Sequence, residues 1–203
     1  MSQLDIADFD EILSTARSIR RKLDFERPLD RQELLDCIDV AVQAPTGATG
    51  ENWRFVVVED KQRKTAIAEV YRAVLEEIVA ERRIELKPTQ KALVDRLPDI
   101  PAMIFPCVDG EPMADTVAAQ VAYYGSILPA AWSLMLALRA RRIGATWTTL
   151  LSARQEELKA ILEMPATTRL TVMLPVGYMK GAVLKRADRL PAGQVTYWDR
   201  WGA

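Results

Sequence analysis

The chain has 203 residues, 27 basic and 28 acidic, with two cysteines and no histidine. The absence of histidine excludes Ser-His-Asp and Cys-His catalysis, histidine-ligated zinc and an imidazole proton shuttle. Two cysteines are too few for a zinc ribbon or an iron–sulfur cluster within one chain. A hydrophobic fraction of 49% is enough for a packed core. The length predicts a single domain over 1–203.

Charge and cysteine usage indicate the class of partner and the compartment. A net charge of −1 predicts no overall attraction to nucleic acid, although a local basic patch can hold one phosphate. Cys37 and Cys107 lie far apart, as buried thiols in a reducing compartment do. The opening residues lack the apolar stretch of a signal peptide. The apolar region 117–138 is interrupted by Gly125 and Pro129 and predicts a buried helix. We therefore expect a cytoplasmic protein without nucleic-acid or membrane partners.

The first half of the chain alternates predicted helices and strands. A short helix over 8–16 precedes a strongly basic stretch. A second helix begins after Asp30, a favourable N-cap, and ends before Pro45. The β-branched run at 53–60 predicts a strand buried on both faces. It is followed by a long charged helix over 61–86.

The second half continues this alternation. Segment 87–101 contains three prolines and is predicted to be a loop or lid. A largely apolar helix over about 114–142, with Pro129 in its middle, is the predicted central helix. Ser152 and Gln155 form a predicted capping box for a helix over 153–162. A second buried strand is predicted over 102–108 and a further strand over 169–177, while 145–151 is predicted to be a strand or a strand-like loop. The pattern predicts an α/β or α+β fold around one sheet.

A long tail, about 178–203, follows the last predicted strand and ends in the sequence YWDRWGA. Its aromatic side chains are costly to leave in water. The tail can fold back on its own domain or wrap a partner subunit, and the residues alone leave both alternatives open.

Four short segments can carry chemistry. RSIRR at 17–21 concentrates arginines and a serine, which bind phosphate by charge-assisted hydrogen bonds. PTGATGEN at 45–52 lets backbone N–H groups approach a flat or anionic ligand, but it is neither a Walker loop nor a dinucleotide fingerprint. GATWTTL at 144–150 offers hydroxyls and backbone donors, and KRADRLP at 185–191 is a second basic spot. Each alone is also compatible with a solvated loop, a connector or strand filler; together they are compatible with a phosphorylated aromatic cofactor.

In this order, the segments resemble the nitroreductase family of FMN-dependent oxidoreductases. The resemblance covers about 14–203, through ARSIRRKLD, VQAPTGATGENWRFVVVED, YGSILPAAWSLMLALRARRIGATWTTL, and LPVGY with the tail. It implies an α+β sandwich around a mixed sheet, forming a homodimer with two FMN molecules at its interface. It also implies that the tail of one subunit wraps the other.

The resemblance assigns the phosphate contacts to two distant parts of the chain. Arg17, Ser18 and Arg20 match N-terminal phosphate and ribityl contacts, and Arg189 matches a C-terminal phosphate contact. Two separate basic spots can neutralise one dianion that neither holds alone.

The remaining matched positions surround the flavin ring. They are Pro45, Thr46 and Gly47 in the loop over the flavin; Ser126, Ile127 and Pro129 in the central helix, from the partner subunit; and Thr148 and Thr149, in the segment whose backbone N–H meets the flavin N5 region. Thr49 and Glu51 stand where many relatives carry asparagine and glutamine. A carboxylate beside the ring disfavours its anionic reduced form.

The resemblance implies a ping-pong oxidoreductase without a catalytic side chain or a metal. NAD(P)H donates hydride to flavin N5, and a small acceptor such as a nitroaromatic, quinone or enone then enters the same site. One alternative is a flavin-binding protein for storage, sensing or cofactor modification, without NAD(P)H turnover. Another is a non-enzymatic interaction module whose basic spots are plain surface.

Overall fold

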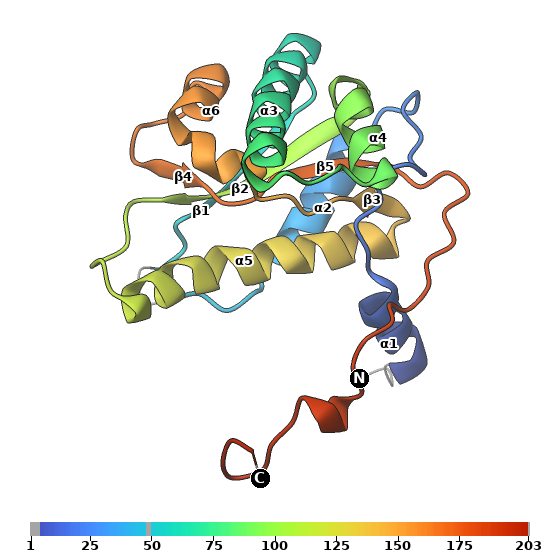
Figure 1. Cartoon of the computed structure of the whole chain (residues 1–203), viewed down its shortest axis with the longest axis vertical. Coiled ribbons are helices and arrows are strands. Elements are labelled where there is room, and N and C mark those ends of the chain that lie inside the picture. Colours follow the sequence, from blue (N-terminus) through green and yellow to red (C-terminus); the bar gives the residue numbers. More distant parts are fainter. Residues whose placement is uncertain (1–4, 48–49, 203) are drawn as a thin grey trace.

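A five-stranded sheet covered by helices on both faces forms the body of the protein (Figure 1). The computed structural model describes residues 5–47 and 50–202. The strands are β1 (Trp53–Val58), β2 (Ala102–Asp109), β3 (Ile143–Ala145), β4 (Thr168–Leu170) and β5 (Leu174–Tyr178). The helices are α1 (Ile6–Thr15), α2 (Arg31–Ala41), α3 (Lys61–Arg82), α4 (Pro88–Arg96), α5 (Val117–Ala140) and α6 (Gln155–Leu162). The predicted α+β class is confirmed.

The strand order is β1-β2-β5-β3, with β4 also beside β2. Every pairing that the structure describes is antiparallel. The mixed sheet implied by the resemblance is therefore wrong in this detail, because β1 and β5 both run opposite to β2, and β3 runs opposite to β5. The edge strand β1 is also less buried than expected, with Val57 37% exposed. Burial on both faces holds for β2, the strand at the centre of the sheet.

Side chains of β2 alternate between two cores, as the period of a strand requires. Ala102 and Ile104 pack on the side of α2 and α5. Met103 and Phe105 pack on the side of α3, α4 and α6. Two of the helices over these faces begin where the sequence predicts. Asp30 accepts hydrogen bonds from the backbone N–H groups of Gln32 and Glu33 in α2, and Asp60 accepts one from Arg63 in α3.

The predicted loop at 87–101 is wrong, because α4 and a 3₁₀ turn at Leu97–Asp99 occupy most of it. Pro88 is the first residue of α4, where proline is tolerated because that position needs no N–H donor. Leu93, Val94 and Leu97 are buried against the core on the α3 side. Tertiary packing therefore holds a proline-rich segment in helical form.

The single strand predicted over 169–177 is broken into β4 and β5. The break lies opposite Pro106 of β2, whose nitrogen has no hydrogen to donate to the ladder. Thr171, between the two strands, donates both its N–H (3.2 Å) and its hydroxyl (2.7 Å) to the Pro106 carbonyl.

Of the two alternatives for 145–151, the strand is wrong, since β3 ends at Ala145. The residues that follow form a strand-like loop in which Thr148 makes an isolated bridge to Met173. The predicted capping box at Ser152 is wrong as well. α6 begins at Gln155, whose side-chain amide bonds the backbone N–H and carbonyl of Leu170 instead of a helix end.

The central helix α5 lies along the sheet in contact with α2, β2 and β3 (Figure 1). Among the helices of the described chain, it alone is long and apolar enough to span a bilayer by length and composition. Half of its most apolar stretch is buried inside the protein, and Ile127, Leu134 and Leu138 are among the buried residues of the helix. It is the core helix that the sequence predicts.

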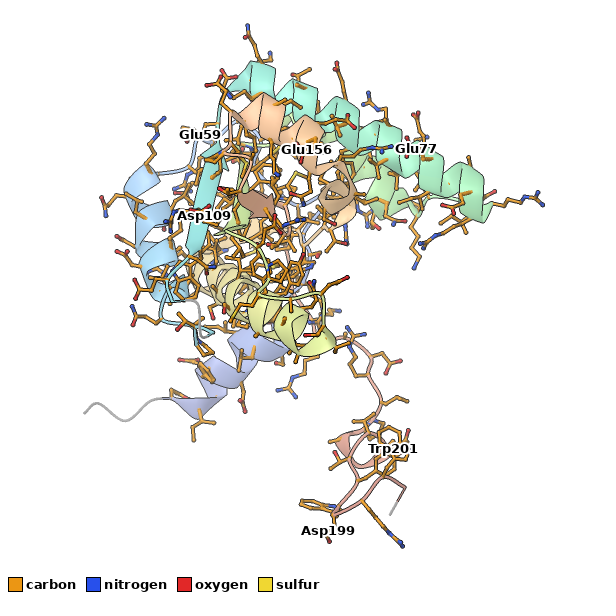
Figure 2. All side chains as sticks on the ribbon, turned by 90° about the vertical axis from the view of Figure 1, so that its left-hand side faces the viewer. Glu59, Glu77, Asp109, Glu156, Asp199 and Trp201 are labelled. Atoms are coloured by element: carbon orange, nitrogen blue, oxygen red, sulfur yellow. The ribbon has the colours of Figure 1, made fainter. Side chains whose placement is uncertain are left out.

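The C-terminal tail leaves the body beside α1 and extends away from it (Figures 1 and 2). From Leu190 to Gly202 every residue is exposed, including Trp198 and Trp201 at 77% and 88%. The rings of Tyr197 and Trp201 pack on each other, with 4.7 Å between centroids. Folding back of the aromatic end on its own domain, one of the two alternatives, is therefore wrong.

Candidate functional site

The fold brings the basic segment 17–21 alongside the threonine-rich segment 144–150. The Ile19 N–H donates to the Ala145 carbonyl (2.9 Å), and Thr146 returns a bond from its hydroxyl to the Ile19 carbonyl (2.9 Å). The approach is so close that a Cβ on Gly144 would lie 2.7 Å from a methyl of Leu23. Two segments more than a hundred residues apart therefore form one wall.

A basic cavity of about 390 Å³ lies against the first of these segments. Its lining residues are Arg17, Ser18, Ile19, Arg20, Arg21, Lys22, Thr89, Gly181, Ala182, Val183 and Leu184. This lining contains four cations and no carboxylate. The Ser18 hydroxyl accepts the Trp147 N–H at 3.2 Å, so its own proton remains able to reach a ligand. The donor set fits a phosphate.

The predicted phosphate contacts are only partly brought together. Arg17, Ser18 and Arg20 share the cavity. The guanidinium of Arg17 donates to the carbonyls of Ser14 (3.0 Å) and Ala16 at the end of α1, and these bonds leave its charge unneutralised. Arg189 is exposed in the tail and lies outside the cavity lining. Its assignment as a phosphate contact stays a prediction.

The predicted loop over the flavin is tied to the central helix of the same chain. The Gly47 N–H donates to the Ser126 hydroxyl at 2.6 Å, and that hydroxyl donates to the Ala122 carbonyl at 3.3 Å. A Cβ on Gly47 would lie 2.9 Å from both acceptors, so the loop approaches as closely as it does because residue 47 is glycine. Pro45 and Thr46 beside it are exposed.

The other predicted ring contacts differ in their availability. Ile127 is fully buried among Trp53 and Val108 of its own chain, and Pro129 is half-buried. Glu51 is exposed. Thr49 lies outside the described residues.

Thr148 and Thr149 have different surroundings, which separates their roles. The N–H of Thr148 donates to the Met173 carbonyl (3.2 Å), and its carbonyl accepts the Met173 N–H (2.9 Å). Thr149 is exposed, and its N–H has no acceptor within the described part of the chain. Of the two predicted N–H groups, that of Thr149 is the one available to a ligand.

Sequence reasoning missed one member of this wall, Tyr71 of α3. Its hydroxyl lies 3.3 Å from Oγ1 of Thr148. Ile67, Tyr71 and Val74 share one helical face, a spacing that indicates only a core position. No local signal names the partner of the hydroxyl.

The chain matches known proteins over the regions that form this site. The sequence model of the nitroreductase family matches residues 13–178. The chain belongs to the nitroreductase family. The matched range includes the basic segment 17–21, the loop 45–52 and the segment 144–150, whereas 185–191 lies beyond it.

The chain is 32% identical over 201 residues to iodotyrosine deiodinase 1 of Rattus norvegicus, covering 93% of this chain and 68% of that protein. It is 27% identical over 177 residues to an iodotyrosine deiodinase of Thermotoga neapolitana, covering 82% and 86%. An iodotyrosine deiodinase crystallised with FMN and 3-iodo-L-tyrosine superposes with a TM-score of 0.68 at 23% identity, over 89% of this chain and 94% of that one. The structural likeness shows that the chain has the nitroreductase fold.

Proposed function

We propose that this protein is a homodimeric FMN oxidoreductase that takes electrons from NAD(P)H and passes them to a small organic acceptor. The observation that carries the proposal is the acid-free basic cavity, whose lining residues Ser18 and Ile19 are hydrogen-bonded to Trp147 and Ala145. It offers charge for a phosphate next to a backbone wall suited to an aromatic ring. When bound, FMN supplies acceptance of hydride at N5 and its transfer to the acceptor.

The residues of this chain bind and orient the cofactor. Arg17 and Arg20 neutralise the phosphate, and Ser18 donates its hydroxyl proton. The loop that contains Gly47, held by α5, would cover the ring of bound FMN. The N–H of Thr149 would be the donor offered to its N5 region. No step requires a proton from a side chain, because water can supply it.

The exposed apolar surface supports a homodimer. α5 presents Val117, Val121 and Trp132 to solvent, and the tail presents Trp198 and Trp201. Large apolar side chains left exposed on these two elements indicate an interaction surface. We propose that the tail of each subunit covers the other and that Arg189 reaches the partner's phosphate. Sedimentation analysis of the full chain tests this, and a monomer at micromolar concentration contradicts it.

The relatives favour a second candidate, reductive dehalogenation of a halogenated tyrosine. Here two electrons and one proton convert an aryl–iodine bond into a carbon–hydrogen bond, and iodide leaves. The supporting observation is 32% identity to a protein named iodotyrosine deiodinase 1. Both candidates would use FMN, so acceptor preference separates them.

A two-step experiment tests the proposal. The purified protein, supplied with FMN, is mixed anaerobically with NADPH or NADH while flavin absorbance is followed. Bleaching is expected, and its absence favours a flavin-binding protein without NAD(P)H turnover. The reduced protein is then mixed with a nitroaromatic, a quinone or 3-iodo-L-tyrosine. Reoxidation by the first two supports the oxidoreductase, and iodide release from the third supports the dehalogenase. Failure to take up FMN contradicts both.

A further inference from the structure

Tyr71 connects helix α3 to the wall of the candidate site. The residue is 5% exposed, and its ring packs in the core formed by α3, α4 and α6 with the sheet. Its hydroxyl is the polar atom that reaches the site, at 3.3 Å from Oγ1 of Thr148. The two residues are 77 positions apart, so this contact joins two segments that are distant in the sequence. The ion pair between Arg154 and Glu77 joins α3 to the turn that follows Thr149.

Thr148 is held on two sides. Its backbone is paired with Met173 through both its N–H and its carbonyl, and its side chain is paired with Tyr71. The next residue, Thr149, is held by Ser152, which gives its N–H (3.0 Å) and its hydroxyl (2.6 Å) to the Thr149 carbonyl. Between these two anchors lies the N–H of the exposed Thr149, which has no acceptor among residues 5–47 and 50–202.

The chemistry of Tyr71 suits a donor. Burial raises the pKa of its phenol, while the bond to Thr148 and the charge of Arg20 act in the opposite direction. The phenol is therefore neutral at physiological pH and keeps its proton. A neutral phenol that donates to Oγ1 leaves the hydroxyl proton of Thr148 free for another acceptor.

We propose that Tyr71 is a positioning residue that, through Thr148, fixes the Thr149 N–H in the place where the flavin ring is expected. The inference rests on the proposed function and adds to it a residue outside the site lining. If Tyr71 acts in this way, losing its hydroxyl changes how well the wall distinguishes reduced from oxidised FMN. If Tyr71 only fills the core, losing the hydroxyl changes stability alone.

Tyr71→Phe removes the hydroxyl and keeps the ring. The measured quantity is the ratio of the dissociation constants for oxidised and reduced FMN, obtained from the reduction potentials of bound and free FMN. A net hydrogen bond of ordinary strength predicts a change of about threefold to tenfold in this ratio. We expect the visible absorption spectrum of bound FMN to change together with this ratio. Thermal melting of the FMN-free protein measures stability separately.

Two further variants keep the inference open to refutation if Tyr71→Phe folds poorly. Thr148→Val removes the partner hydroxyl with little change in shape, and we expect the same change in the ratio. Thr148→Ser retains a hydroxyl and is expected to restore the wild-type ratio. The effects of Tyr71→Phe and Thr148→Val together should be smaller than their sum, because both remove one contact.

Tyr123→Phe is the matched control. Tyr123 is also a buried tyrosine, and its hydroxyl donates to the Gly110 carbonyl at 2.7 Å. We expect its ratio to change by less than about twofold. The inference is overturned if wild type, Tyr71→Phe and Thr148→Val bind FMN with the same ratio of dissociation constants. It is also overturned if Tyr123→Phe changes this ratio as much as Tyr71→Phe does. Failure of the wild type to bind FMN overturns the proposed function as well.

Discussion

Replacing Ser126 with alanine tests how the loop at Pro45–Gly47 is held. The Ser126 hydroxyl accepts the Gly47 N–H at 2.6 Å, and the residue is only 3% exposed. Deleting the acceptor leaves the Gly47 N–H unpaired in a half-buried place, which costs about 1–3 kcal/mol. Alanine is a better helix former than serine by about 0.5 kcal/mol, which partly offsets the loss. We expect a net loss of about 0.5–2.5 kcal/mol in the free energy of unfolding.

The assay is urea unfolding followed by tryptophan fluorescence, with FMN affinity measured on the same variant. Ser133→Ala is the control, because Ser133 lies on the same helix, half-buried, without a side-chain hydrogen bond to any described residue. It gains the helix propensity without losing a contact. FMN affinity should fall in Ser126→Ala only. If the two variants have the same stability and affinity, the hydroxyl of Ser126 does not hold the loop.

Three more predictions concern the cofactor, the tail and the core. Arg17→Ala and Arg189→Ala should each weaken FMN binding roughly tenfold to a hundredfold in equilibrium dialysis, since each removes a charged phosphate donor, while Arg82→Ala should not. Unchanged affinity in both variants contradicts the phosphate assignment. Deleting 190–203 should give a monomer or insoluble protein in sedimentation analysis, because it uncovers the apolar surface; a soluble dimer argues against wrapping. Burial raises the pKa of the Cys107 thiol from 9.0 to about 12. Its contribution to stability is therefore complete below pH 9 and is lost as the pH rises toward 12, by about 1.4 kcal/mol for each unit. Between pH 8 and pH 10, the free energy of unfolding in urea should decrease less for Cys107→Ala than for wild type. Equal decreases in the two proteins refute this.

The order and type of most elements could be predicted from the sequence because their signals are local. Asp30 and Asp60 cap their helices, because a side chain beside a helix start can accept from the first N–H groups without help from distant residues. The apolar run of β2 is buried as predicted. Predictions failed where distant residues decide: α4 forms because the core accepts Leu93 and Val94, and β4 separates from β5 because Pro106 lies opposite the break.

By itself, the sequence determined which residue types are present to do chemistry. The lack of histidine, the arginines at 17–21 and the small-residue loop at 45–52 indicate a bound cofactor, and the family match agrees with this. Only the tertiary structure decided which of these groups are available. Hydrogen bonds between segments consume the Thr148 N–H and leave that of Thr149 free. They also assign the Ser126 hydroxyl to a loop of its own chain and bring Tyr71 to the wall. Such pairings depend on distance in space, and a linear pattern records distance along the chain alone.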